Sequence, residues 1–258
     1  MLACETIALY GGRKVEVRRG GDGPTIVWLH GPHGLRPKDP VIAALSRRYT
    51  VVAPLAPGFN DVDELDQIRD VHDLALHYDD ILDELRLDGV ALVGHSFGAM
   101  IAAELAAHVP RRVARLVLLS PFGLWRDDHP VADLFARPYA AIDRLIWKSG
   151  EASAEMADPA NFSNDPVERA VSLAQAMTAV AKFIWPIPDK GLRRRLPRVT
   201  APTLIVHGGE DAFVPAIYAD EFAATIPGAR KAIIPGAGHM APYEQTDQVI
   251  GLLARHLR

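Results

Sequence analysis

A serine between two glycines is the feature of the sequence that most clearly indicates chemistry. The segment 94–98 reads Gly-His-Ser-Phe-Gly; it follows an apolar run at 90–93 and opens an alanine-rich stretch at 97–108. A serine on a tight turn between a buried strand and a helix exposes its hydroxyl at the edge of a sheet. Free N–H groups at the start of that helix would stabilise an anion formed there. We therefore predict that Ser96 is a nucleophile.

A serine hydroxyl is a weak nucleophile until a base takes its proton, and the chain offers ten histidines as bases. His239 is the best placed, because it lies in a glycine-containing loop directly after an apolar run at 230–234. Asp211 follows another apolar run, at 203–206, and we expect its carboxylate to orient the imidazole. Glu210, the adjacent carboxylate, is the alternative for this role.

Short apolar runs alternate with amphipathic segments along the chain. The predicted strands are 26–29, 50–53, 90–93, 116–119, 203–206 and 230–234, and the predicted helices are 39–46, 66–87, 97–108, 215–225 and 243–257. The runs are nearly continuous rather than alternating, as strands buried on both faces require. The pattern predicts an α/β fold: a mostly parallel, doubly wound sheet of about eight strands, covered by helices on both faces.

No strand is predicted between 120 and about 200, where aromatic residues and prolines accumulate. The segment is too long for a loop, so we predict a helical insertion at 121–200 that covers one end of the sheet. Residues 1–120 and 201–258 would form the core. The insertion's aromatic residues either wall a substrate pocket or pack the insertion itself. The predicted pocket residues are His30, Phe122, Trp125, Trp147, Trp185 and Met240.

The sequence resembles the α/β-hydrolase fold family over nearly its whole length, and specifically the single-domain members with a helical cap. The order Ser96, Asp211, His239 is the order of that family. His-Gly-Pro-His-Gly at 30–34 is similar to its oxyanion loop, and Ala-Pro-Gly-Phe at 56–59 to the turn after its fourth strand. The resemblance implies a serine hydrolase that transfers an acyl group to water. The aromatic insertion favours a small, largely apolar carboxylic ester as substrate.

Pro32 departs from the family's oxyanion loop. In many members the residue after His-Gly donates its backbone N–H to the oxyanion, and proline has no N–H. The Phe97 amide remains as one donor, while the second comes from His33, Gly34 or a side chain, or is missing. Loss of one donor costs about 10²- to 10³-fold in rate. We favour a shifted loop, because Gly34 permits unusual backbone angles; a weaker hydrolase is the alternative.

Two other functions fit the same pattern. The chain could hydrolyse a carbon–carbon bond in ring-cleavage diketones, since such relatives share the architecture and triad. They often carry a tryptophan after the catalytic histidine, where this sequence has Met240. It could instead be a non-catalytic ligand-binding member of the fold, with Pro32 disabling the oxyanion hole. A serine at this turn argues against the relatives that use a nucleophilic aspartate.

Composition bounds the partners and the compartment. The 258 residues are 49% hydrophobic and 23% charged, with a net charge of −4, which excludes a disordered chain and a strongly basic nucleic-acid binder. The single cysteine, Cys4, allows no internal disulfide. The chain shows neither a signal-peptide pattern nor an apolar run of about 20 residues. We expect a cytoplasmic protein that acts on a small molecule without metal, organic cofactor, nucleic acid or membrane; the sequence does not set its oligomeric state.

Overall fold

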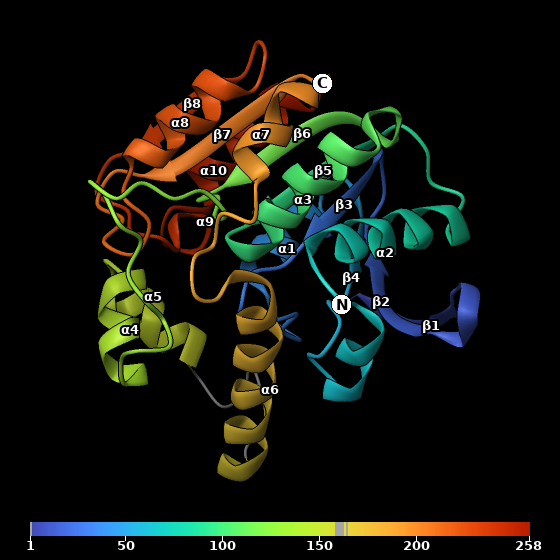
Figure 1. The fold of residues 1–258 in the computed structure, drawn as a ribbon, viewed down its shortest axis with the longest axis horizontal. Coiled ribbons are helices and arrows are strands. Elements are labelled where there is room, and N and C mark those ends of the chain that lie inside the picture. Colours follow the sequence, from blue (N-terminus) through green and yellow to red (C-terminus); the bar gives the residue numbers. More distant parts are fainter. Residues whose placement is uncertain (1, 158–162, 164) are drawn as a thin grey trace.

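Eight strands form one sheet in the order β1-β2-β4-β3-β5-β6-β7-β8 in the computed structural model, which describes residues 2–157, 163 and 165–258 (Figure 1). The strands are β1 (Ala3–Ala8), β2 (Lys14–Gly20), β3 (Thr25–Leu29), β4 (Thr50–Pro54), β5 (Val90–His95), β6 (Val113–Leu119), β7 (Thr203–Gly208) and β8 (Arg230–Ile234). β2 runs antiparallel to both neighbours and every other pair is parallel. The predicted mostly parallel sheet is confirmed.

The central strands are aligned so that their carboxyl ends meet. Gly94 of β5 pairs with Leu29 of β3 on one side and with Leu118 of β6 on the other, and Leu118 pairs with Ile205 of β7. All six residues of β7 are buried, as expected for a strand covered on both faces. The loops after β3, β5, β7 and β8 therefore share one edge of the sheet.

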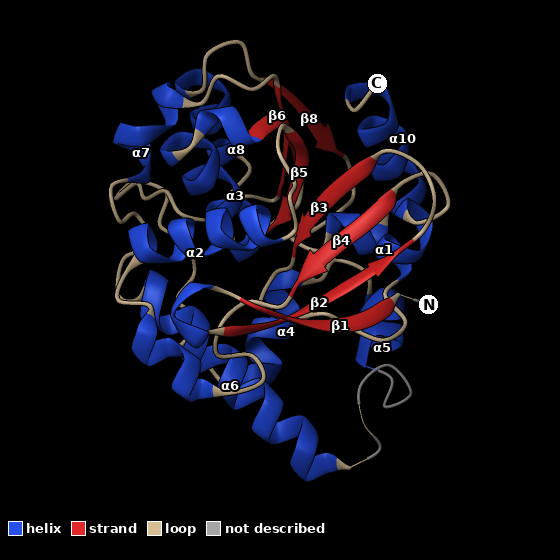
Figure 2. Cartoon of the chain, turned by 90° about the vertical axis from the view of Figure 1, so that its right-hand side faces the viewer, coloured by secondary structure: helices blue, strands red, loops and turns tan. Residues whose placement is uncertain are grey.

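Helices cover both faces of the sheet (Figure 2). The α-helices described outside 121–200 are α1 (Pro40–Leu45), α2 (Val71–Glu84), α3 (Phe97–His108), α8 (Ile217–Thr225), α9 (Ala241–Glu244) and α10 (Thr246–His256). α1 and α10 contact each other on one face, and α2 and α3 do so on the other. α3 is buried from its first residue to Ala107, because its alanines let it lie close to β5 and β6.

Between β6 and β7 the chain forms α4 (Tyr139–Ile146), α5 (Gly150–Ala157), α6 (Pro166–Ile184) and the short α7 (Leu192–Arg195). α4, α5 and α6 lie together beyond one end of the sheet (Figure 1). In the part of 121–200 that the structure describes, no residue belongs to a strand. The division into a core and a cap at these boundaries stays a prediction.

Three element boundaries differ from the sequence prediction. The hairpin of β1 and β2 was not predicted to be part of the sheet, because β1 is almost wholly exposed and has no continuous apolar run. The helix predicted at 66–87 begins at Val71, because the Asp70 side chain caps it by accepting two backbone N–H bonds. The helix predicted at 243–257 is two helices that meet at Gln245. No helix of the described chain has both the length and the apolar character to span a bilayer.

Candidate active site

Ser96 lies on a strained turn between β5 and α3. Its backbone has φ 54° and ψ −115°, a region that residues other than glycine rarely adopt. Two glycines make the turn possible by allowing close backbone contacts. A β-carbon on Gly98 would lie 2.1 Å from the Leu29 carbonyl oxygen, and one on Gly94 would lie 2.4 Å from the Gly98 carbonyl oxygen. The sequence pattern around Ser96 is thus a steric requirement of this turn.

The three predicted catalytic residues are brought together by a chain of hydrogen bonds. His239 Nε2 lies 2.8 Å from Ser96 Oγ, and His239 Nδ1 lies 2.7 Å from Asp211 Oδ2. All three residues are buried. Because an ionised carboxylate only accepts, Nδ1 carries the proton, and the lone pair of Nε2 in the neutral ring faces the serine hydroxyl. This arrangement can take a proton from Ser96.

Asp211 is held by four donors. Its Oδ1 accepts from the Phe213 N–H at 3.0 Å and the Val214 N–H at 2.8 Å, and its Oδ2 lies near both His239 and His207 Nε2, the latter at 3.1 Å. Burial alone would raise the pKa of Asp211, but the His239 charge and the hydrogen bonds from the two histidines lower it well below its usual range. Asp211 is therefore an ionised acceptor.

His207 is the contributor to this site that the sequence reasoning missed. It is the last residue but one of β7 and fully buried, four positions before Asp211. The sequence did contain a signal for it: a histidine four residues before a predicted acid, in the same strand-to-loop segment, is close enough to contact the carboxylate. Glu210, the alternative acid, instead pairs with Lys148 Nζ at 2.6 Å and is about half exposed.

His95, directly before the nucleophile, packs against His239 with ring centroids 5.7 Å apart. Its Nε2 lies 3.3 Å from the His239 carbonyl oxygen. Burial, followed by the charge of His239, lowers the pKa of His95 to about 3, so the ring is neutral near pH 7. His95 therefore supports the His239 loop without adding charge to the site.

The Phe97 N–H is the first candidate for a backbone donor to an oxyanion. This N–H is at the first position of α3, where a helix provides no internal acceptor, and no described residue accepts from it. Gly34 has φ +70° and donates its N–H to the Gly31 carbonyl oxygen at 3.1 Å, so it is not free to act as the second donor. The His33 N–H has no acceptor in the described chain. The predicted pair, Phe97 and His33, remains a proposal.

A small hollow of about 40 Å³ opens at Ser96. Its lining joins residues of the sheet's loops to residues of the 121–200 segment: Pro32, His33, His95, Ser96, Phe213, His239 and Met240 from the first, and Leu134, Ile142, Ile146, Leu173 and Met177 from the second. Met240, one of the predicted pocket residues, is part of this lining. Leu173 and Met177 were missed, although their spacing of four on α6 is a helical signal.

Two of the predicted pocket residues lie elsewhere. His30 is buried, with Nδ1 2.8 Å from the Gly31 carbonyl oxygen and Nε2 accepting from the Ala56 N–H at 2.9 Å. Both ring nitrogens are used to join two loops, so the placement of His30 in the pocket was wrong. Trp185 follows α6 and is 57% exposed, so its placement as a wall was also wrong.

The other three aromatic residues lie near the hollow or at the surface. Phe122 stacks on Phe213 at 5.5 Å, and Phe213 contacts the His239 ring, so Phe122 lies one layer behind the wall. The ring centroids of Trp147 and His33 are 6.5 Å apart. Trp125 donates its indole N–H to Asp127 at the surface.

A family model described as the alpha/beta hydrolase family matches residues 26–252, most of the chain. The chain belongs to the alpha/beta hydrolase family. The chain spans only 12% of the polyketide synthase ThaQ of Burkholderia thailandensis, to which it is 32% identical over 92% of its own length. It spans 65% of a second curated relative.

Two family relatives match nearly end to end. The chain is 30% identical to a pimeloyl-[acyl-carrier protein] methyl ester esterase of Nitrosomonas europaea, covering 89% of this chain and 93% of that protein. It is 27% identical to a 2-hydroxy-6-oxo-6-phenylhexa-2,4-dienoate hydrolase of Burkholderia cepacia, and the match covers 91% of this chain and 87% of that protein. One of these relatives is named as an esterase and the other as a dienoate hydrolase.

A solved structure shows the same fold. The meta-cleavage product hydrolase of Pseudomonas fluorescens IP01 superposes with a TM-score of 0.77 and 20% identity, covering 98% of this chain and 97% of that one. At this identity the likeness concerns the alpha/beta hydrolase fold alone.

Proposed function

We propose that the protein is a serine hydrolase that transfers an acyl group to water, with a carboxylic ester as substrate. The observation that carries the proposal is the continuous chain of contacts from Ser96 Oγ through His239 to the ionised Asp211. A nucleophile, a base and an orienting acid in this order are the parts that acyl transfer needs.

The reaction runs in two halves. Ser96 Oγ attacks the substrate carbonyl carbon while His239 Nε2 takes the hydroxyl proton. The tetrahedral intermediate then breaks its bond to the alcohol, which leaves with the proton that His239 returns. Water attacks the acyl-serine in the second half, His239 again takes and returns a proton, and the carboxylic acid is released. Asp211 stays ionised throughout and stabilises the imidazolium.

The Phe97 N–H is the first donor to the intermediate's oxyanion in this proposal, and the His33 N–H is the second. The turn that places Gly34 N–H on the Gly31 carbonyl supports a shifted loop over a missing donor. Two donors are expected to be worth about 10²- to 10³-fold each in rate.

The proposal is tested with a fluorophosphonate probe and a series of p-nitrophenyl esters. The wild-type protein should label and turn over, and Ser96→Ala should do neither while its thermal melt stays cooperative. Absence of labelling in the wild-type protein would favour the non-catalytic ligand-binding alternative.

Carbon–carbon hydrolysis is the second candidate, because one relative that matches nearly end to end carries the name of a dienoate hydrolase. The same serine would attack a ketone, and a carbanion would leave instead of an alkoxide. A vinylogous diketone acid in the substrate panel separates the two: turnover of the diketone without turnover of any ester would replace the ester proposal.

A further inference from the structure

A larger hollow of about 420 Å³ lies beside the small one at Ser96. The two share Pro32, His33 and Leu173 in their linings, so the larger hollow begins where the nucleophile's hollow ends. Its volume lies within the range of small-molecule pockets. A substrate with its carbonyl at Ser96 would extend into this space.

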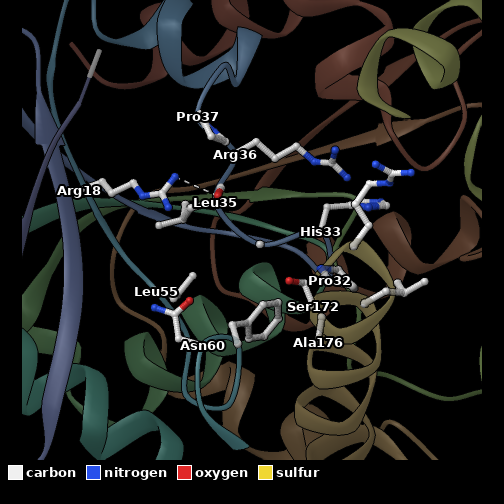
Figure 3. Close-up of a pocket in the computed structure, with 14 residues that line it drawn as sticks. Arg18, Pro32, His33, Leu35, Arg36, Pro37, Leu55, Asn60, Ser172 and Ala176 are labelled. Atoms are coloured by element: carbon white, nitrogen blue, oxygen red, sulfur yellow. Dashed lines mark hydrogen bonds between the residues drawn. The ribbon is translucent and has the colours of Figure 1, made fainter. Parts of the chain in front are cut away.

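The charged side chains in the lining of the larger hollow are all basic. Three arginines, Arg18, Arg36 and Arg169, contribute to it, and none of the fourteen described lining residues is acidic. Figure 3 shows the Arg36 side chain extending toward His33, whereas Arg18 points at Leu35 from the opposite side. The remaining lining includes apolar side chains such as Leu55 and Phe59.

The three arginines are held in different ways. Arg18 contacts the Glu16 carboxylate at 3.0 Å and the Leu35 carbonyl oxygen at 2.9 Å, so its charge is already compensated. Arg169 Nη1 donates to the Ser163 carbonyl oxygen at 2.7 Å; among the described residues no carboxylate pairs with it. A neutral carbonyl orients a guanidinium without cancelling its charge, so Arg169 retains the capacity to bind an anion.

Arg36 lies on the wall beside His33. Its Nη1 donates to the Met156 carbonyl at the end of α5, which directs the guanidinium into the space between core and cap. Burial, and after it the Arg36 charge, lowers the pKa of His33 to about 3. His33 is therefore a neutral hydrogen-bonding group between the reacting centre and the arginines.

We propose that this hollow binds an anionic oxygen group of the substrate, a carboxylate or a phosphate, through Arg169, and that an apolar chain along Leu55 and Phe59 joins that group to the carbonyl at Ser96. The inference rests on the proposed hydrolase function and refines its substrate from an apolar ester to one with an anionic end. Guanidinium forks match the oxygens of both anions.

The test compares three p-nitrophenyl esters with acyl chains of equal length that end in a methyl, a carboxylate or a phosphonate. We expect kcat/KM to be about 10-fold or more higher for one of the anionic esters, as charge-assisted hydrogen bonds give. The better of the two identifies the anion. Equal or lower kcat/KM for both anionic esters, with good turnover of the methyl-ended one, overturns the anion site and leaves the proposed function standing.

Arg169→Gln should reduce the ratio of anionic to neutral kcat/KM toward one, mostly through KM. Arg255→Gln, which removes an exposed arginine from α10 outside this lining, is the matched control and should leave the ratio unchanged. A thermal melt of each variant checks folding. An unchanged ratio in a folded Arg169→Gln protein contradicts the assignment.

A binding measurement separates failure of the anion site from failure of the proposed function. Adipic acid monoamide and hexanamide are titrated calorimetrically into wild-type and Arg169→Gln protein. If adipic acid monoamide binds more tightly than hexanamide to wild type but not to Arg169→Gln, the result supports the site even if no ester is turned over. A third amide of the same length that ends in a phosphonate is titrated in the same way, and equal binding of all three probes to wild type overturns the site.

Discussion

His207 Nε2 lies 3.1 Å from Asp211 Oδ2, the same oxygen that lies 2.7 Å from His239 Nδ1. The His207 Nε2 also lies 2.8 Å from the Val214 carbonyl oxygen. Both neighbours are acceptors, so Nε2 carries the proton and is shared between them. His207 thus ties the end of β7 to the far side of the acid loop and fixes the carboxylate that orients the proposed base.

Replacement of His207 should loosen Asp211 and slow the chemical step. His207→Leu removes a hydrogen bond to a charged acceptor, which contributes about 1.5–3 kcal/mol to stability. We expect that loss in the free energy of unfolding, together with a larger fall in kcat than rise in KM. His207→Gln places an amide N–H near the position of Nε2 and should restore part of both. Equal kcat in the Leu variant and wild type would contradict this role.

Asp211 should also make stability depend on pH. Its pKa is lower in the folded protein than the roughly 3.9 of an unfolded aspartate. The ionised carboxylate therefore contributes stability that is complete above about pH 5 and is lost as pH falls toward the folded pKa. The stability difference between wild type and Asp211→Asn should shrink between about pH 5 and pH 3, measured by urea unfolding. Asp22→Asn, at an exposed turn, is the control; a difference constant with pH argues against the linkage.

The two adjacent carboxylates of the acid loop should differ sharply in their effect on turnover. Asp211→Asn keeps the shape but reverses the tautomer preference of His239, and a comparable change in a serine protease costs about 10⁴-fold in kcat. Glu210→Gln removes only the exposed pair with Lys148, so kcat should change less than about two-fold. Steady-state turnover of a p-nitrophenyl ester measures both. A large loss in Glu210→Gln instead would reassign the acid.

The parts of the fold that the sequence predicted are those fixed by local chemistry. Central strands are continuous apolar runs because both faces are buried, and the glycines around Ser96 are present because no β-carbon fits at the turn. The β1–β2 hairpin was missed because an exposed edge strand needs no apolar pattern. Its place in the sheet depends on pairing with β4, which lies beyond any local window.

The candidate triad was predictable because each member lies in the loop or turn that follows a strand, whereas the residues of the pocket wall were not predictable. Side chains of the 121–200 segment line the hollow or face away according to how α4 and α6 lie over the loops at the edge of the sheet. Trp185 is a large aromatic residue of the kind that often lines a pocket, but it is 57% exposed. Met177 and Leu173 line the hollow at Ser96 instead. The sequence could not show that both ring nitrogens of His30 contact backbone groups of two loops, which keeps its side chain out of the hollow.

The turn at Ser96 should not tolerate a β-carbon at Gly98. The added methyl group would lie 2.1 Å from the Leu29 carbonyl oxygen, so β3 and α3 must move apart. Overpacking of this kind costs about 1–3 kcal/mol or more. Gly150→Ala is the matched control, because nothing lies within 4 Å of its β-carbon position and it begins a helix. Gly98→Ala should lower the free energy of unfolding and the turnover, and Gly150→Ala neither; equal melts for the two variants contradict the steric argument.

Three truncations should separate wall residues from packing residues. Met177 lines the hollow at Ser96 and is only partly buried, so Met177→Ala should enlarge the hollow and shift preference toward longer or bulkier acyl chains with a modest change in melting temperature. Phe122 is 5% exposed behind Phe213, and Phe122→Ala should cost about 3–5 kcal/mol of stability with little change in the chain-length profile. Trp185→Ala should change neither.

The chain-length profile and the thermal melt are measured together on each of these variants with the p-nitrophenyl ester series. The comparison isolates the wall because the three side chains differ in position but all belong to the same 121–200 segment. A segment that acts only as a lid would give the same profile for all three. If Trp185→Ala moves the profile while Met177→Ala leaves it unchanged, the substrate reaches Ser96 past the carboxyl-terminal end of α6 rather than through the hollow at Ser96.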